Sequence, residues 1–255
     1  MNVLDKLDEF YNTFLGEKGI MGKSYNKRKI YYFKVRKTDY PVVLVQYGIH
    51  AREHITCHLA LKQINHFIRK GKKGTVYFIP ALNPDGISIA IEKYPLYKGN
   101  AKCVDLNLNF DARFGSGKTN HREFSIDNFI GNKPFSEKES KALRDFTLRV
   151  KPNLTISYHC KGQEIYFDFH QNKKEFLKDF YYAYLVAKIT GYKIITGLDS
   201  AGGYKDWCVE KLKIPALTIE VGSDELTHPI TEKDLPNIFL ENRHVLNLIT
   251  ECFND

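Results

Sequence analysis

The apolar and polar residues of this chain follow two different periods. Short runs of β-branched and aromatic residues, bounded by proline or glycine, predict buried strands. Longer segments with apolar residues at every third or fourth position, such as residues 54–69, predict helices. The predicted strands are residues 41–47, 75–79, 154–158, 164–167 and 216–221, and the predicted helices are residues 3–15, 54–69, 136–150, 173–190, 204–211 and 232–252.

The order of these elements indicates the fold. Strand 41–47, helix 54–69 and strand 75–79 follow one another as in a parallel strand pair joined by a crossover helix. Strands and helices go on alternating toward the C-terminus, which is typical of an α/β protein. No internal repeat, low-complexity tract or linker divides the chain. We therefore predict an α/β/α sandwich, a mixed and mostly parallel sheet flanked by helices, in a single domain covering residues 1–255.

Three segments carry specific local signals. Residues 83–86, with the sequence Asn-Pro-Asp-Gly, predict a turn after the second strand. Ser136 and Glu139 have the Ser-x-x-Glu spacing of a capping box at the start of helix 136–150. Residues 100–134 are rich in Asn, Asp, Gly and Arg and show no periodicity. A long irregular segment in a compact domain is usually functional or mobile, and we expect this of residues 100–134.

The composition is that of a globular protein. Hydrophobic residues make up 43% and charged residues 27% of the 255 positions, which argues against long disorder and fibrous repeats. The longest apolar stretch, residues 180–187, is too short to span a bilayer. The first residues contain no apolar signal-peptide core, and the odd number of cysteines, five, does not suggest a disulfide framework. These features predict a cytoplasmic protein.

The net charge is positive, with 38 Lys and Arg against 30 Asp and Glu, or +8. Such an excess is compatible with nucleic acid, an anionic membrane surface or an acidic substrate as partner. The densest basic groups, residues 27–29 and 69–73, look like a loop and the solvated end of a helix. We therefore favour a soluble basic surface and predict neither nucleic-acid nor membrane binding.

Residues able to hold a metal follow the ends of predicted strands, where ligands bind in open α/β sheets. His50 and Glu53 come after strand 41–47, and His159 comes after the third predicted strand. Two histidines, one glutamate and an open position for water are the pattern of a catalytic zinc site rather than a structural one. Glu220, at the end of the last predicted strand, would be the general base that deprotonates the water.

Two alternatives use the same residues. Each histidine taken alone also fits a hydrogen-bonded structural role, whereas Glu220 in an apolar strand is costly to bury unless it is paired or close to a metal. Residues 50–54 also have the sequence H-x-x-E-H, in which, on a continuous helix, both histidines bind zinc and Glu53 is the base. Gly48, directly after a strand, argues against such a helix and leaves His54 as a surface or packing residue.

Five segments, in the same order, resemble motifs of the zinc carboxypeptidase family (the carboxypeptidase A/B and T type, M14). The resemblance extends over about residues 40–250. It implies one zinc ion per chain, bound by His50, Glu53 and His159, with Glu220 as the base. The segments are residues 48–56 (H-x-x-E), 83–86 (N-P-D-G), 104–111 (similar to D-x-N-R-N-[FW]-D), 157–159 (S-x-H), and 202–207 (G-G-x-x-D-W) followed by Glu220.

Departures from these motifs concern the substrate. Leu108 stands where the resemblance implies an arginine that holds the terminal carboxylate of the substrate, and leucine cannot form that charge-assisted pair. Asn107, the usual helper of that arginine, is kept. Leu198 replaces the tyrosine that would cover the bound terminus. Arg113 and Arg122, in the irregular segment, are candidates to replace the lost anchor.

Three further basic residues are candidates for substrate contacts. Lys98 stands where the resemblance implies an arginine that polarises the scissile carbonyl, and Arg52 lies beside the metal motif. Lys205 stands at the position of the specificity pocket, where a lysine would favour an acidic leaving residue. The alternative for Lys205 is a solvent-exposed side chain on a short helix.

Bacterial members of the family include enzymes that cleave γ-D-glutamyl–diaminopimelate bonds in cell-wall peptides, and residues 161–166 look more like these members than like digestive carboxypeptidases. The diaminopimelate side chain carries a carboxylate and an ammonium group, which would suit a lysine pocket. The resemblance therefore implies a peptidase that releases an acidic or diaminopimelate-type residue from a small cell-wall peptide. The alternatives are a carboxypeptidase acting on ordinary C-terminal residues and a degenerate protein that only holds zinc.

Overall fold

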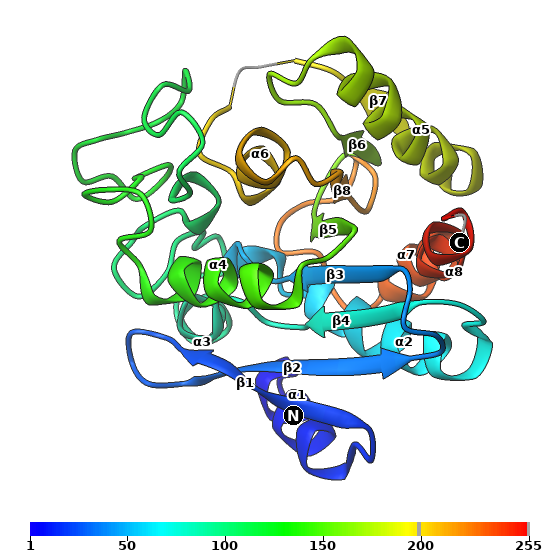
Figure 1. The fold of residues 1–255 in the computed structure, drawn as a ribbon. Helices are drawn as coiled ribbons and strands as arrows, with labels where there is room; N and C mark the ends of the chain where they lie inside the picture. The colour runs from blue at the N-terminus through cyan, green and yellow to red at the C-terminus, as the bar shows by residue number, and fades with distance from the viewer. Residues whose placement is uncertain (198–199, 254–255) are drawn as a thin grey trace.

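The computed structural model describes residues 1–197 and 200–253, and in them one eight-stranded sheet carries helices on both faces (Figure 1). The strands are β1 Glu17–Lys23, β2 Lys29–Arg36, β3 Val42–Tyr47, β4 Thr75–Ile79, β5 Leu154–His159, β6 Glu164–Tyr166, β7 Lys193–Ile195 and β8 Ala216–Glu220. The helices are α1 Val3–Thr13, α2 Ile55–Lys70, α3 Pro84–Glu92, α4 Lys138–Val150, α5 Lys173–Thr190, α6 Tyr204–Trp207, α7 Leu235–Asn242 and α8 Val245–Glu251.

Four parallel strands form the middle of the sheet. The strand order is β1-β2-β4-β3-β5-β8-β6-β7, and β4, β3, β5 and β8 pair in parallel. β2 and β6 flank this group in antiparallel pairing. All side chains of Val43–Tyr47 in β3 are buried, because helices cover both faces of a central parallel strand. The mixed, mostly parallel sheet confirms the predicted α/β fold.

Alternate side chains of the same strand pack into different cores. Val43, Val45 and Tyr47 of β3 pack with residues of α2, α5, α7 and α8. Leu44 points to the opposite face, where it belongs to a core with residues of α4 and α6. This alternation follows from the two-residue period of a strand. It places the two helical layers that Figure 1 shows on the two faces of the sheet.

Several predicted elements differ from the structure. Residues 83–86 begin helix α3 instead of forming a turn: the Asn83 side chain accepts a hydrogen bond from Gly86 N at 3.0 Å, and Pro84 occupies the first helical position, where its missing N–H costs nothing. The predicted helix 232–252 is two helices, α7 and α8. The predicted helix 204–211 is the short α6 followed by a wider π-type turn at Cys208–Leu212.

The hairpin of β1 and β2 and the short strand β7 are absent from the elements that the sequence predicts. No residue of β1 is buried, because β1 is an edge strand rich in Gly and Lys. Its weak alternation therefore gives no clear period-2 signal. β7 has three residues and none is fully buried, so it is also too weak to detect.

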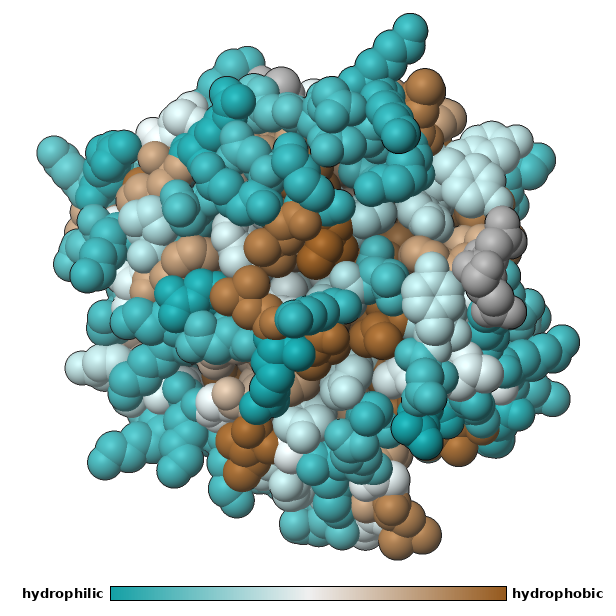
Figure 2. Space-filling model, viewed as in Figure 1, coloured by the Kyte–Doolittle hydropathy of each residue, from teal (hydrophilic) through white to brown (hydrophobic). Residues whose placement is uncertain are grey.

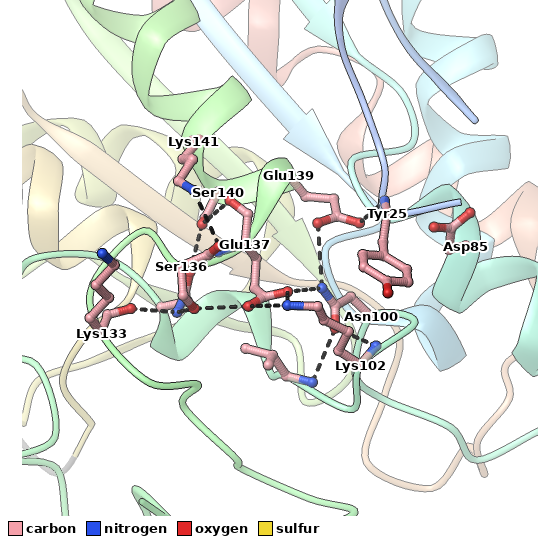
Figure 3. Close-up of polar contacts among 12 residues, drawn as sticks. Tyr25, Asp85, Asn100, Lys102, Lys133, Ser136, Glu137, Glu139, Ser140 and Lys141 are labelled. Carbon is pink, nitrogen blue, oxygen red and sulfur yellow. Dashed lines mark hydrogen bonds and ion pairs between the residues drawn. The ribbon is translucent and has the colours of Figure 1, made fainter. Parts of the chain in front are cut away.

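Polar side chains fasten the irregular segment to the start of α4 (Figure 3). The predicted capping box is wrong: α4 begins after Glu137 without a side-chain cap, and the Ser136 hydroxyl donates to Glu137 Oε1 at 2.8 Å. Asn100 Nδ2 donates to Glu137 Oε2 at 2.9 Å, and Asn100 Oδ1 accepts from the Val104 amide at 3.1 Å. These bonds fix the backbone between Asn100 and Val104, just before a segment that borders the site described below.

Asn109 makes a second set of buried contacts in this region. Its Nδ2 donates to the carbonyls of Ile130 and Lys133 and to Ser136 Oγ, at 2.8, 3.2 and 2.9 Å. Its Oδ1 accepts from the Glu137 amide at 3.2 Å and from Ser140 Oγ at 2.6 Å. One fully buried amide therefore holds together residues 109–140, most of which lie outside helices and strands.

We expect Asn109→Ala to lower the free energy of unfolding by about 2–4 kcal/mol, because it leaves several buried donors and acceptors unpaired. Urea denaturation monitored by circular dichroism measures this change. Asn65→Ala, at an exposed position of α2, is the control and should change stability by less than about 0.5 kcal/mol. Equal stabilities of the two variants would contradict the role given to Asn109.

The surface offers little sign of a membrane-spanning element. In the part of the chain that the structure describes, no helix is both long and apolar enough to cross a bilayer. On the face shown in Figure 2, hydrophilic side chains dominate and hydrophobic ones lie in small separate groups. Such scattered apolar side chains are ordinary on protein surfaces.

Candidate active site

The C-terminal ends of β3, β5 and β8 lie side by side, and β5 and β8 end in the predicted site residues His159 and Glu220. Tyr47 of β3 pairs with Tyr158 of β5, and His159 of β5 pairs with Glu220 of β8. After β3 the chain turns at Gly48, which has a φ of +62°. A Cβ atom there would lie 2.6 Å from Cys57 Sγ, so the turn needs glycine for both conformation and space.

His50, Glu53 and His159 converge at this edge of the sheet. Their ligand atoms lie within 4.8 Å of one another, and all three side chains are buried. His50 Nδ1 lies 2.8 Å from Glu53 Oε1 and 3.2 Å from His159 Nδ1, and His159 Nδ1 lies 3.1 Å from Glu53 Oε2. The backbone places them without a continuous helix, because His50 is extended and residues 51–53 form one 3₁₀ turn.

The H-x-x-E-H alternative does not fit this geometry. α2 begins at Ile55, so His50 and His54 do not share one face of a helix. In the described residues, the only group of three or more possible metal-binding side chains contains His159 and not His54. His58, one turn further along α2, lies 3.6 Å from Glu232 instead.

The three side chains fit a zinc ion. His50 Nδ1 and His159 Nδ1 face each other. An imidazole nitrogen that lacks a proton can only accept, so two such nitrogens can both bind a cation. Two imidazole nitrogens and one carboxylate oxygen are a donor set that Zn²⁺ binds well. Burial alone would raise the pKa of Glu53, but His50 and His159 hold it below its usual range, so Glu53 is a carboxylate. A cation at this point would satisfy all three groups.

Asp105 lies directly behind His50 and is a site residue that the sequence analysis missed. Its Oδ1 lies 3.1 Å from His50 Nε2 and accepts from the Asn107 amide at 3.0 Å. A carboxylate on the far nitrogen of a metal-binding histidine fixes the orientation of the ring. The available signal was the position of Asp105 in segment 104–111, between two apolar residues.

Glu220 lies at the edge of a cavity of about 390 Å³. On β6, Glu164 is its cross-strand partner. Burial raises the pKa of Glu220 well above its usual value, and the neighbouring carboxylates of Glu53 and Glu164 raise it further. A carboxylate in such surroundings accepts a proton readily. Asn107, Leu108, Tyr166 and Lys205 line the same cavity.

Lys205 is not the solvent-exposed side chain of the alternative interpretation. Its ammonium lies 2.7 Å from Asp206 Oδ1 and 2.6 Å from the carbonyl oxygen of Asp168, and only 12% of its side chain is exposed. Lys205 is also one of the residues that line the cavity. The charge is partly balanced by Asp206, so the cavity offers a cation with an anion beside it.

Arg113 and Arg122, the two candidates for a carboxylate anchor, both contact other parts of the protein. Arg113 Nε pairs with Glu210 Oε1 at 2.9 Å, and Arg122 contacts the carbonyl and ring of Phe114. Neither is among the residues that line the cavity. Their assignment as substrate-binding residues therefore stays a prediction that the lining of this cavity does not support. Leu198, the other departure at this site, lies outside the described residues.

Lys98 and Arg52 do lie beside the group of possible metal ligands. Lys98 Nζ lies 2.7 Å from Asp105 Oδ2, and its pKa is raised mainly by Asp105 against the opposing effect of burial. Arg52 directly precedes Glu53, and its buried Nε has no hydrogen-bond partner in the structure. Arg52 Nε is thus an unpaired buried donor, whereas the Lys98 ammonium is already engaged by Asp105.

Comparison with known proteins gives one family and a consistent set of relatives. A family model described as zinc carboxypeptidase matches residues 2–244. A gamma-D-glutamyl-L-diamino acid endopeptidase 1 of Lysinibacillus sphaericus is 25% identical over 227 residues, covering 73% of this chain and 56% of that protein. Murein peptide amidase A of Escherichia coli K12 is 27% identical over 195 residues, covering 71% of this chain and 73% of that protein.

Solved structures share the fold. Bovine thrombin-activatable fibrinolysis inhibitor, in complex with a tick carboxypeptidase inhibitor, superposes with a TM-score of 0.83 at 24% identity, covering 98% of this chain and 93% of that chain. Murein-tripeptide amidase of Escherichia coli O157 superposes with a TM-score of 0.65 at 19% identity, covering 97% of each chain. The chain spans between 44% and 57% of the length of the first curated relatives that it matches.

Proposed function

The chain belongs to the zinc carboxypeptidase family, and from this premise we propose that it is a zinc-dependent peptidase that hydrolyses a peptide or γ-glutamyl amide bond. The single observation that carries the proposal is the convergence of His50, Glu53 and His159 next to Glu220, at the ends of three adjacent strands. We assign one zinc ion per chain to the first three residues. Glu220 is left free to act on water.

The residues around the three metal-binding side chains have different roles in the proposed hydrolysis. Zinc, when bound, lowers the pKa of a water molecule and polarises a carbonyl group. Glu220 accepts a proton from the attacking water and donates it to the leaving amine, for which its raised pKa is suited. The Lys98 ammonium donates to the carbonyl oxygen on which negative charge develops. Asp105 keeps the His50 ring oriented throughout.

We propose that the leaving residue occupies the 390 Å³ cavity and carries both an acidic and an amino group, as diaminopimelate does. Lys205 is the cation in its lining, and Asp206 and Glu220 supply carboxylates. Leu108 offers no partner for a terminal carboxylate. The relatives named for gamma-D-glutamyl-diamino acid and murein-peptide hydrolysis support the same assignment.

We propose Arg52 as the residue that binds the substrate on the acyl side of the scissile bond. In a γ-linked glutamyl peptide, the free α-carboxylate lies a few bonds from the scissile carbonyl. Arg52 belongs to the 3₁₀ turn that carries Glu53, and its Nε is buried without a partner. A carboxylate at this position would form the charge-assisted hydrogen bonds for which arginine is suited. An α-linked peptide lacks that carboxylate.

The five cysteines bear on where such a reaction would take place. All five are free thiols in the structure, and Cys57, Cys160 and Cys208 are buried. Free buried thiols are common in proteins of reducing compartments. This supports the cytoplasm as the site of action, on peptides that have already been released from the cell wall.

Lys205→Met should lower kcat/KM by about 10- to 100-fold for a peptide with diaminopimelate as leaving residue, because it removes a charge-assisted hydrogen bond. The same variant should change kcat/KM only slightly for the matched peptide that ends in lysine and lacks the second carboxylate. Liquid chromatography of the released amino acids measures both rates. Lys211→Met, in the π-type turn after α6, is the control and should behave as the unmodified protein.

The ratio of the two rates tests the substrate assignment separately from the catalytic one. If Lys205→Met kept the full preference for diaminopimelate over lysine, Lys205 would not determine which leaving residue the enzyme selects. The peptidase assignment itself would stand in that case, because the total rate of hydrolysis reports on Glu220 and the metal ligands.

A further inference from the structure

We propose that Asn128, in the irregular segment, is a positioning residue that holds the Lys98 ammonium in place for the substrate carbonyl. The inference rests on the proposed function, because it concerns the group that stabilises charge on the substrate oxygen. Asn128 Oδ1 accepts a hydrogen bond from Lys98 Nζ at 2.9 Å. The contact joins residues 30 positions apart in the chain.

The need for a second contact follows from the chemistry of lysine. A lysine side chain has a flexible four-carbon stem and a compact ammonium with three donors, whereas arginine has a rigid planar fork. The Lys98 ammonium forms an ion pair with Asp105 Oδ2 at 2.7 Å and donates a hydrogen bond to Asn128 Oδ1. These two contacts define where the ammonium lies, and the hydrogen bond to Asn128 leaves donors of the ammonium for a substrate oxygen. One acceptor alone would leave the stem free to rotate.

The two groups that contact Lys98 differ in charge: Asp105 is a carboxylate and Asn128 is a neutral amide. Asp105 is shared between Lys98 and His50, and both partners hold its pKa below the usual range against the effect of burial. Asn128 contributes a neutral amide oxygen. It therefore adds a second fixed point without adding negative charge, and the ammonium keeps more of its positive charge for the developing oxyanion.

The backbone conformation and hydrogen bonds around Asn128 hold its side chain close to Lys98. Asn128 has a φ of +60°, in the left-handed region that asparagine tolerates better than most residues. Its carbonyl accepts from the His121 amide at 2.9 Å, and the next carbonyl, of Phe129, accepts from the Asp105 amide at 2.8 Å. The segment is thus bonded directly to the residue that forms the other contact of Lys98.

The variant Asn128→Gly tests the inference, because glycine accepts the left-handed backbone and removes only the amide. We expect kcat to fall about tenfold with KM nearly unchanged, less than the 10²–10³-fold loss typical for deleting an oxyanion donor itself. Melting temperature and zinc content should stay those of the unmodified protein. Asn132→Gly, an exposed asparagine of the same segment, is the control and should leave kcat unchanged.

A double-mutant cycle with Lys98→Met separates positioning from a structural role. In the Lys98→Met background, Asn128→Gly should have no further effect on kcat or on the affinity for a phosphonate peptide that mimics the tetrahedral intermediate. Equal losses in both backgrounds, or an unchanged kcat in the single variant, would overturn the inference. Absence of any hydrolysis by the unmodified zinc-loaded protein would instead overturn the proposed function.

Discussion

Glu220→Gln is expected to lower kcat by about 10²–10⁴-fold, the contribution typical of a positioned general base. The amide keeps the shape of the side chain but cannot accept the proton of the attacking water. Glu220 belongs to neither the group of three possible metal ligands nor its hydrogen bonds, so zinc content should remain that of the unmodified protein. Steady-state hydrolysis of a peptide and metal analysis of the same sample measure both quantities.

The cross-strand neighbour of Glu220 provides a matched control. Glu164 lies opposite Glu220 on β6 and accepts a hydrogen bond from the Tyr166 hydroxyl at 2.6 Å. Glu164→Gln therefore removes a carboxylate of the same size from the same pair of strands, and kcat should change by less than about tenfold. Equal losses in the two variants, or full activity of zinc-loaded Glu220→Gln, would refute the assignment of the base.

Replacing one metal ligand is the second change with a large expected effect. His50→Asn and His159→Asn should each abolish measurable hydrolysis and reduce bound zinc well below one ion per chain, because two ligands hold the metal poorly. Inductively coupled plasma mass spectrometry after dialysis measures the zinc that remains. Chelation of the unmodified protein should have the same effect, and added zinc should restore its activity.

His54→Asn is the control that the sequence itself suggests. The H-x-x-E-H interpretation predicts that this variant loses zinc, whereas the structure places His54 outside the ligand group. We therefore expect His54→Asn to keep one zinc ion and most of its activity. Loss of zinc in His54→Asn with retention in His159→Asn would reverse the assignment of the ligands.

Much of the fold was predictable from strong local signals, whereas the ligand group was predicted from the order of five segments that resemble one family. The central strands are short, apolar and bounded by proline or glycine, and ligand-binding residues follow the ends of such strands. Gly48 was informative for the same reason, since it marks the turn that keeps His50 off a helix. Gly48 thus argued against His54 as the partner of His50, and the resemblance supplied His159.

Contacts that depend on the irregular segment were not predictable. The charges of Arg113 and Arg122 suit a carboxylate, so the sequence predicts both as anchors. Nothing in the local sequence reveals that Glu210 and Phe114 engage them. The contact between Lys98 and Asn128 is hidden in the same way, because it forms only when a segment without periodicity folds back onto the site.

Local signals also misled where they were ambiguous. Asn-Pro-Asp-Gly is a turn sequence, yet asparagine before proline is equally suited to the start of a helix, and here α3 follows. Ser-x-x-Glu at residues 136–139 has the spacing of a capping box, but the Ser136 hydroxyl is engaged by Glu137 and by Asn109. For Ser136, the long-range contact with Asn109 helps to decide which local conformation forms.

The most direct test of the account is mass spectrometry of the products from two matched peptides, one with a γ-D-glutamyl–diaminopimelate bond and one with the corresponding α-linked bond. The zinc-loaded protein should release diaminopimelate from the γ-linked peptide at a rate at least tenfold above that from the α-linked peptide. Chelator and Glu220→Gln should each abolish the release. A folded, zinc-loaded protein that cleaves neither peptide, or that cleaves the α-linked peptide faster, would contradict the account.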